Sequence, residues 1–176
     1  STGNTAIIAQ QTKAAGTGTV TVSAGNVSGT AGILAISAGS GNATVNANGN
    51  VTGTAGAGIS VSLTNAANQG NAINVAVAAG TTTTGTGATG VTTNLGQSNG
   101  TATVALAGRA TGTNGVQQTS IAGSNLTTLT AAARADGTGG VVQSNGTGTN
   151  TITNAGTIQG TTAGVVQNNT GSGNSV

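Results

Sequence analysis

The few ionisable side chains of this sequence set the chemistry it could perform. The 176 residues include three basic side chains, Lys13, Arg109 and Arg134, one acidic side chain, Asp136, and no His or Cys. General acid–base catalysis needs two titratable groups within reach of the substrate, and a Ser or Thr nucleophile needs a base beside it. Lys13 is the one candidate base, with no identifiable partner. The sequence therefore predicts a protein that is not an enzyme and has no catalytic residues.

Metal, cofactor and nucleic-acid sites are also not expected. Calcium-loaded solenoid repeats carry an Asp in every turn, whereas Asp136 stands alone, and we interpret it as a polar turn residue close to Arg134. Glycine-rich fragments such as GAGIS arise by chance from 33 glycines, and a phosphate-binding motif has meaning only between a strand and a helix. Three scattered cations do not form the basic patch that phosphates require.

The elements that position these side chains follow from an internal repeat. A Gly-Thr pair, followed within a few residues by Gly-Ile or Gly-Val, recurs six times, in steps of 24, 32, 27, 25 and 23 residues. We call the glycine of each pair the landmark glycine: Gly29, Gly53, Gly85, Gly112, Gly137 and Gly160. A period near 25 indicates a repeat architecture. The one long step predicts an outward loop over about 63–72, our candidate for a contact loop.

Alternating segments between the landmarks predict the strands. TVTVS (19–23) and NATVN (42–46) place Val on one face and Thr or Asn on the other, which is typical of strands with one buried face. With a short NVSG-type segment and the strand after the landmark, each period holds three short strands. NLTTLT (125–130) breaks the alternation and predicts a bulge or a register change. Glycine-rich corners are expected to supply positive φ angles.

Together these patterns predict an all-β fold, a parallel β-solenoid of about six to seven coils of roughly 25 residues. Residues 1–176 form one domain, with an incomplete first coil over 1–15 and a polar tail over about 167–176. Stacking places Val27 beside Val51 and Ile33 beside Ile59. Because the sequence has no aromatic residue, the core must be narrow and aliphatic. Its predicted members are Val20, Val22, Val27, Ile33, Val45, Val51, Ile59, Val75, Val91, Val104, Val116, Val141, Ile152, Ile158 and Val165.

Two surface features follow from the same stacking. Arg109 and Arg134 each lie three residues before a landmark glycine, so they are expected to be neighbours on adjacent coils, with both side chains in water. The outward positions of the alternating strands predict a ladder of threonines. Its members are Thr19, Thr21, Thr44, Thr103, Thr151 and Thr153.

Phrases such as GTVTVSAGNVSGTAGILAIS and TITNAGTIQGTTAGVVQNN resemble the passenger repeats of bacterial autotransporter (type V secretion) surface proteins, including adhesin-like ones. The resemblance implies secretion and display at the extracellular side of a bacterial cell surface. It also implies partners on host or neighbouring cells. No apolar run approaches the length of about 18 to 20 residues that a membrane span needs, so we expect no membrane insertion of this segment.

Two classes of function stay open at this point. The first is a structural or adhesive surface protein, a rigid solenoid segment able to stack on other copies or to assemble into fibres. Self-association is expected because the end coils lack the charges and prolines that protect strand edges. The alternative is an ice-binding solenoid that uses the outward Thr and Asn columns.

Overall fold

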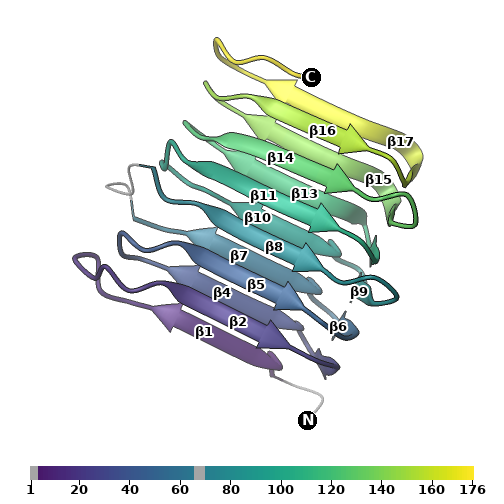
Figure 1. Cartoon of the computed structure of the whole chain (residues 1–176), viewed down its shortest axis with the longest axis horizontal. Helices are drawn as coiled ribbons and strands as arrows, with labels where there is room; N and C mark the ends of the chain where they lie inside the picture. The colour runs from purple at the N-terminus through teal and green to yellow at the C-terminus, as the bar shows by residue number, and fades with distance from the viewer. Residues whose placement is uncertain (1–3, 66–69) are drawn as a thin grey trace.

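The computed structural model describes residues 4–65 and 70–176, and it forms a parallel β-solenoid of about six coils. The 17 strands of the described residues stack coil on coil from the N-terminal end to the C-terminal end, which lie at opposite ends of the stack (Figure 1). A single coil cannot bury its own apolar face, and stacking buries it against the next coil. The predicted all-β solenoid fold and its spacing near 25 residues are confirmed.

One side of the solenoid is a six-stranded parallel sheet, with one strand from each coil. Its strands have alternating burial, because successive side chains of a strand point to opposite faces. The strands are β2 (Val20–Ala24), β5 (Ala43–Ala47), β8 (Ile73–Val77), β11 (Thr101–Leu106), β14 (Ser124–Leu129) and β16 (Asn150–Asn154).

The rest of each coil belongs to an eleven-stranded sheet. One row of this sheet follows the landmark glycines and contains β1 (Ile7–Gln11), β4 (Ile33–Ser37), β7 (Ile59–Leu63), β10 (Val91–Asn94) and β13 (Asn114–Ser120). A shorter row contains β3 (Val27–Gly29), β6 (Val51–Gly53), β9 (Thr82–Gly85) and β12 (Arg109–Thr111). In the last two coils the two rows merge into the long strands β15 (Arg134–Asn145) and β17 (Thr157–Asn169). These coils therefore hold two strands, where the sequence predicts three.

The register of the sheets places equivalent residues of successive coils directly above one another. Val27 pairs with Val51, and Ile33 pairs with Ile59, as the repeat predicts. We call such a vertical set of equivalent residues a column. The longest apolar column begins at Ile7 and ends at Val165, through Ile33, Ile59, Val91, Val116 and Val141.

The apolar side chains of the core are all aliphatic, and their exposure rises toward the two ends. Val27, Ile152 and Ile158 are partly buried and pack against the core. Val165 was predicted to be a core residue, but it is 48% exposed. It points inward from β17, and no coil covers it among the described residues. The other predicted core residues are buried: Val20, Val22, Ile33, Val45, Val51, Ile59, Val75, Val91, Val104, Val116 and Val141.

The landmark glycines are required for close packing rather than for positive φ. The positive φ angles of the described residues occur at Gly70, Gly80, Gly87 and Gly96, none of which is a landmark glycine. A Cβ atom on Gly53 would overlap the carbonyl oxygen of Ala57 in the same corner. The predicted positive φ at glycine-rich corners is thus confirmed at glycines such as Gly87 of GTGATGV, whereas the landmark glycine lets the chain fold tightly back on itself.

Two predicted segment boundaries shift in the structure. Leu63 ends β7 and is buried, so the predicted loop over 63–72 begins after it. Part of that loop, residues 66–69, lies outside the described residues. The predicted polar tail over 167–176 begins inside a strand, because residues 167–169 belong to β17. Further along it, Ser175 forms a parallel bridge with Asn150 of β16.

Candidate functional site

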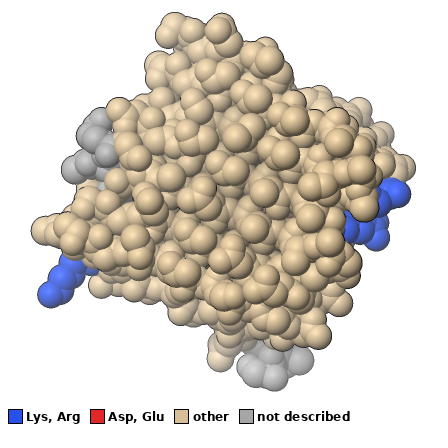
Figure 2. Space-filling view, viewed as in Figure 1, with Lys and Arg blue, Asp and Glu red and all other residues tan. Residues whose placement is uncertain are grey.

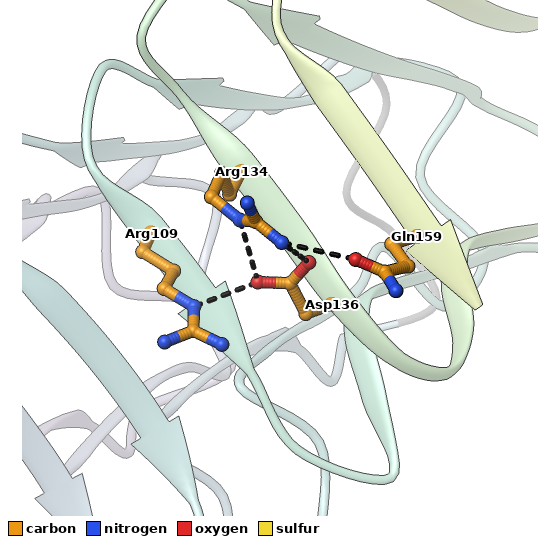
Figure 3. A network of polar contacts seen from close by, with 4 residues as sticks. All are labelled: Arg109, Arg134, Asp136 and Gln159. Atoms are coloured by element: carbon orange, nitrogen blue, oxygen red, sulfur yellow. Dashed lines mark hydrogen bonds and ion pairs between the residues drawn. The ribbon is translucent and has the colours of Figure 1, made fainter. Parts of the chain in front are cut away.

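Arg109, Arg134 and Asp136, from β12 and β15, form one charged cluster, which Gln159 of β17 extends to a third coil (Figure 3). Arg109 of β12 pairs in register with Arg134 of β15, as predicted. The Asp136 carboxylate lies between them and accepts from Arg109 Nε at 2.7 Å and from Arg134 Nη2 at 3.1 Å. Arg134 Nη2 also donates to Gln159 Oε1 at 3.0 Å on the next coil. The cluster therefore links adjacent coils and neutralises part of the repulsion between the two arginines.

Asp136 is held in its charged form by the two arginines. Burial alone would raise its pKa, but the hydrogen bonds and charges of Arg134 and Arg109 outweigh burial and hold the pKa below its ordinary value. The Asp136 residue is 9% exposed, whereas the side chains of Arg109 and Arg134 are 48% and 45% exposed. Both carboxylate oxygens are engaged by guanidinium groups. A carboxylate held in this way is a poor proton acceptor, so the cluster acts as a structural ion-pair network.

Lys13 lies far along the chain from this cluster, in the turn that follows β1. It is exposed, and its carbonyl oxygen accepts hydrogen bonds from Gly16 N and Gln11 Nε2. Figure 2 shows basic side chains at two separate places at the margins of this view, with an uncharged surface between them. The structure thus brings Arg109, Arg134 and Asp136 together and leaves Lys13 apart from them.

A buried ladder of amide side chains crosses the core in the C-terminal half. Gln143 Nε2 donates to Gln118 Oε1 at 2.8 Å, and Gln167 Nε2 donates to Gln143 Oε1 at 2.9 Å. Gln118 Oε1 also accepts from Thr127 Oγ1 at 2.6 Å, and Gln118 Nε2 donates to the carbonyl of Ala102 at 2.8 Å. Gln118 and Gln143 are completely buried. Buried polar groups persist in a core when they are hydrogen-bonded in this way.

A second chain of amide side chains begins on the inner face of the six-stranded sheet and ends at Asn169 of β17. Asn125 Nδ2 donates to Asn150 Oδ1 at 2.9 Å, and Asn150 Nδ2 donates to Asn169 Oδ1 at 3.0 Å. This arrangement corrects the bulge predicted over 125–130, because β11 and β14 pair without a register shift. The alternation of NLTTLT is intact, with Asn125 and Thr127 facing the core and Leu126 facing outward. The pattern looked broken because polar residues occupy inward positions.

The amide ladder is not among the predictions from the sequence, although the sequence carries a signal for it. Gln118, Gln143 and Gln167 each come two residues after the Val that follows a landmark, in GVQQ (115–118) and twice in GVVQ. Side chains two residues apart on a strand share a face. A residue type that repeats at that offset therefore belongs to the same inward face as the core valines.

Part of the predicted threonine ladder forms one column on the outer face of the six-stranded sheet. Thr21, Thr44, Thr103 and Thr151 fall in register there. Asn74 and Leu126 occupy the same column between them. Thr153 lies one column further along, paired with Thr128, and Thr19 precedes β2. The structure therefore supports a column of four threonines rather than a ladder of six.

A shallow apolar groove runs beside this column. It has a volume of about 260 Å³ and crosses β5, β8, β11 and β14 at their C-terminal ends. Its floor is formed by small side chains, among them Ala76 and Ala105, and Asn46 and Thr128 lie at its two ends. The outer face of this sheet is thus uncharged, with a groove of small apolar side chains next to the threonines.

The described part of the chain has neither a cluster of metal-binding side chains nor a membrane-spanning helix. Residues 4–65 and 70–176 contain no group of three or more His, Cys, Asp or Glu side chains that could hold a metal ion. The same residues contain no helix with the length and apolar character needed to cross a membrane. Comparison with known proteins found no matching family model, no similar curated protein and no similar solved structure.

Proposed function

We propose that this chain is a non-enzymatic structural and adhesive segment of an extracellular surface protein. In this role a rigid solenoid displays contact surfaces on its flat sides and ends, with itself or a host or neighbouring cell as partner. The observation that supports the proposal most is the unbroken parallel register from β2 to β16, through which the core columns run. Rods built in this way resist bending because every coil is hydrogen-bonded to both neighbours.

The chemistry of the cluster supports a role without catalysis. The chain has one carboxylate side chain, and two guanidinium groups engage both of its oxygens. The proposed location at a bacterial cell surface rests on the resemblance of the repeats to autotransporter passengers. We propose no cofactor, no nucleic-acid partner and no insertion of this segment into a membrane.

Adhesion can be tested with the purified 176-residue chain coupled to beads. We expect beads that carry the chain to bind to cell surfaces in larger numbers than beads that carry an unrelated protein of equal mass. A matched variant, Thr103→Lys, places a charge on the six-stranded face without touching the core. Equal binding by coated and control beads would remove the adhesive part of the proposal and leave the structural part.

The second candidate function is ice binding. It is favoured by one observation, the column of Thr21, Thr44, Thr103 and Thr151 on an uncharged face. Asn74 and Leu126 interrupt that column, which makes this candidate the weaker of the two. Thermal hysteresis of the purified chain tests it. Activity that Thr103→Lys abolishes would support ice binding, and no activity at high concentration would exclude it.

A further inference from the structure

The charged cluster of β12 and β15 carries one more positive charge than its own residues neutralise. Arg109 and Arg134 share a single partner, Asp136, which is the only acidic side chain of the 176-residue sequence. One excess positive charge therefore remains on two guanidinium groups whose side chains are each about half exposed. No other residue of the sequence can balance this charge, so its counterion must come from outside these 176 residues.

The free hydrogen-bond donors of the cluster belong mainly to Arg109. Its Nε atom donates to Asp136, whereas its two Nη atoms donate to no group among the described residues. Figure 3 shows both Nη atoms on the side of the guanidinium group away from its bond to Asp136. Arg134 uses Nε and Nη2 for Asp136 and Gln159, which leaves Nη1. A guanidinium edge with two free N–H donors matches two oxygens of a carboxylate or a sulfate.

Asp136 holds the two guanidinium groups in place. Its Oδ2 atom accepts from both Nε atoms, at 2.7 Å from Arg109 and at 3.2 Å from Arg134. The Asp136 side chain is only 12% exposed, so this clamp lies beneath the surface. An incoming anion therefore meets donors that are already oriented, which reduces the conformational entropy that binding costs.

A first hollow, of about 330 Å³, lies beside the two arginines. Arg109 and Arg134 line it together with the turns that precede β9, β12 and β15. All its other lining residues are Ala, Gly or Thr, among them Gly80, Thr81 and Gly108. The lining of the first hollow thus contains no negative charge and no bulky side chain that would keep an oxyanion away from the arginines.

A second hollow, of about 390 Å³, is also lined by Arg109 and has a polar lining. Its other lining residues include Asp136, Thr138, Gln159 and Thr161. Hydroxyl, amide and carboxylate groups of this kind exchange hydrogen bonds with hydroxyl groups of a ligand. Because the sequence has no aromatic residue, a sugar ring in this hollow would be held by hydrogen bonds rather than by stacking.

We propose that the two hollows bind an acidic polysaccharide, with one carboxylate or sulfate of the polymer held by Arg109 and Arg134. This inference rests on the proposed adhesive function and names the ligand class and the site. The oxyanion lies in the first hollow, and hydroxyl groups of the sugar lie in the second hollow beside Thr138 and Gln159. Arg109 lines both hollows and joins the two parts of the site.

The size of the charge and the lining favour a polysaccharide over other polyanions. One excess positive charge suits a polymer whose charges are separated by whole sugar units. A nucleic acid carries closely spaced phosphates and is bound by a row of cations, which this cluster does not provide. Protein partners are bound mainly through aromatic and Arg anchors in desolvated pockets, and the two hollows have no aromatic residue in their lining.

Binding of the purified chain to immobilised polymers at low ionic strength tests the site. We expect binding to dextran sulfate or polygalacturonate and none to neutral dextran, and the two acidic polymers distinguish a sulfate from a carboxylate ligand. Arg109→Gln should weaken binding by about tenfold, which corresponds to about 1.4 kcal/mol. Arg134 keeps its hydrogen bonds to Asp136 in this variant, so the fold should be retained, as circular dichroism can verify.

The matched control is Lys13→Gln, which removes the same charge from an exposed side chain outside the cluster. It should bind the acidic polymer as the unmodified chain does. Equal losses in Lys13→Gln and Arg109→Gln would show that net charge alone attracts the polymer, and this result would overturn the site. Absence of binding to both acidic polysaccharides, or tighter binding to polyglutamate or DNA, would also overturn it.

Nuclear magnetic resonance reads the two arginines directly in the unmodified chain. Since the sequence has two Arg residues, the spectrum of guanidinium Nε–H groups contains two signals, which Arg109→Gln assigns. We expect glucuronate to shift both signals and to leave the backbone amide signal of Lys13 unchanged, whereas glucose should shift neither. Arginine signals that do not respond to glucuronate or to sulfate would contradict the proposal.

Coated beads separate this site from the adhesive function itself. Beads that carry Arg109→Gln should bind in smaller numbers to cells that display acidic polysaccharide than beads that carry Lys13→Gln. Equal binding of the two kinds of bead, above that of the unrelated protein, would overturn the site and leave adhesion intact.

Discussion

Gln143 donates from its Nε2 atom to the Oε1 atom of Gln118 at 2.8 Å in the centre of the solenoid, where both side chains are completely buried. Each glutamine therefore satisfies a neighbour on the adjacent coil. A slip of two residues between β13 and β15 would instead place Gln143 opposite Val116 or Ser120. The amide ladder thus specifies the register of the C-terminal coils in a way that an aliphatic column cannot.

We predict that Gln143→Leu lowers the free energy of unfolding by about 1–3 kcal/mol, because it leaves amide groups of Gln118 and Gln167 without their partner. Urea-induced unfolding followed by circular dichroism measures the change. The matched control is Gln10→Leu, at an exposed outward position of β1, which should change stability by less than about 0.5 kcal/mol. Equal effects of the two substitutions would show that the ladder contributes nothing specific.

Thr93→Val is expected to stabilise the fold. Thr93 is 1% exposed, and its hydroxyl finds no hydrogen-bond partner within the described residues. Replacing the hydroxyl by a methyl group removes the cost of burying an unsatisfied polar atom, about 1 kcal/mol. Thr92→Val, at the adjacent outward position, is the control. A loss of stability in Thr93→Val, measured by thermal unfolding, would mean that the hydroxyl has a partner in solution.

The single carboxylate side chain gives a simple pH dependence. Since the pKa of Asp136 is lower in the folded chain than its ordinary value, the unfolded chain binds more protons in acid. The stabilisation is present above about pH 4 and is lost as the pH falls through the folded pKa. Because both arginine side chains are about half exposed, we expect a loss of about 1 kcal/mol or less. Asp136→Asn should remove this pH dependence, and an unchanged acid transition in that variant would contradict the assignment.

The landmark glycines should be intolerant of a side chain. A Cβ atom on Gly53 would overlap the backbone of Ala57 and Gly56, whereas one on Gly18 would meet no atom within 4 Å. We predict that Gly53→Ala destabilises the fold by about 1–3 kcal/mol through overpacking. Gly18→Ala should be neutral or stabilising by up to about 1 kcal/mol. The midpoints of urea-induced unfolding of the two variants distinguish a corner that needs Gly for close packing from one that needs only a flexible backbone.

Much of the fold could be predicted from the sequence, because each coil must repeat the spacing of the one below it. The landmark glycines set the period, and pairs such as Ile33 with Ile59 follow from it directly. The polar part of the core was not predicted. A strand is recognised by apolar residues on one face and polar residues on the other, and the inward Asn125 and Thr127 of β14 remove that difference. The exposure of Val165 depends on what covers the last coil, which a local pattern does not contain.

The charged cluster was predicted in part. The equal offsets of Arg109 and Arg134 from their landmark glycines predict that the two residues are neighbours, and they are. The same reasoning placed Asp136 in a turn, whereas it lies in β15, between the two guanidinium groups. The merging of two strand rows into β15 extends the strand through this position, and the period alone gives no sign of that merging.

Distances between spin labels along one outward column test the central claim, a rigid stack of coils in continuous register. Leu34, Gln117, Val142 and Val166 belong to one such column, and Leu34 is three, four and five coils from the others. Double electron–electron resonance on the three double-labelled variants should give narrow distance distributions. Their mean distances should rise by about 4.8 Å per coil, to about 14, 19 and 24 Å. Broad distributions, or distances that do not rise in equal steps, would contradict the account.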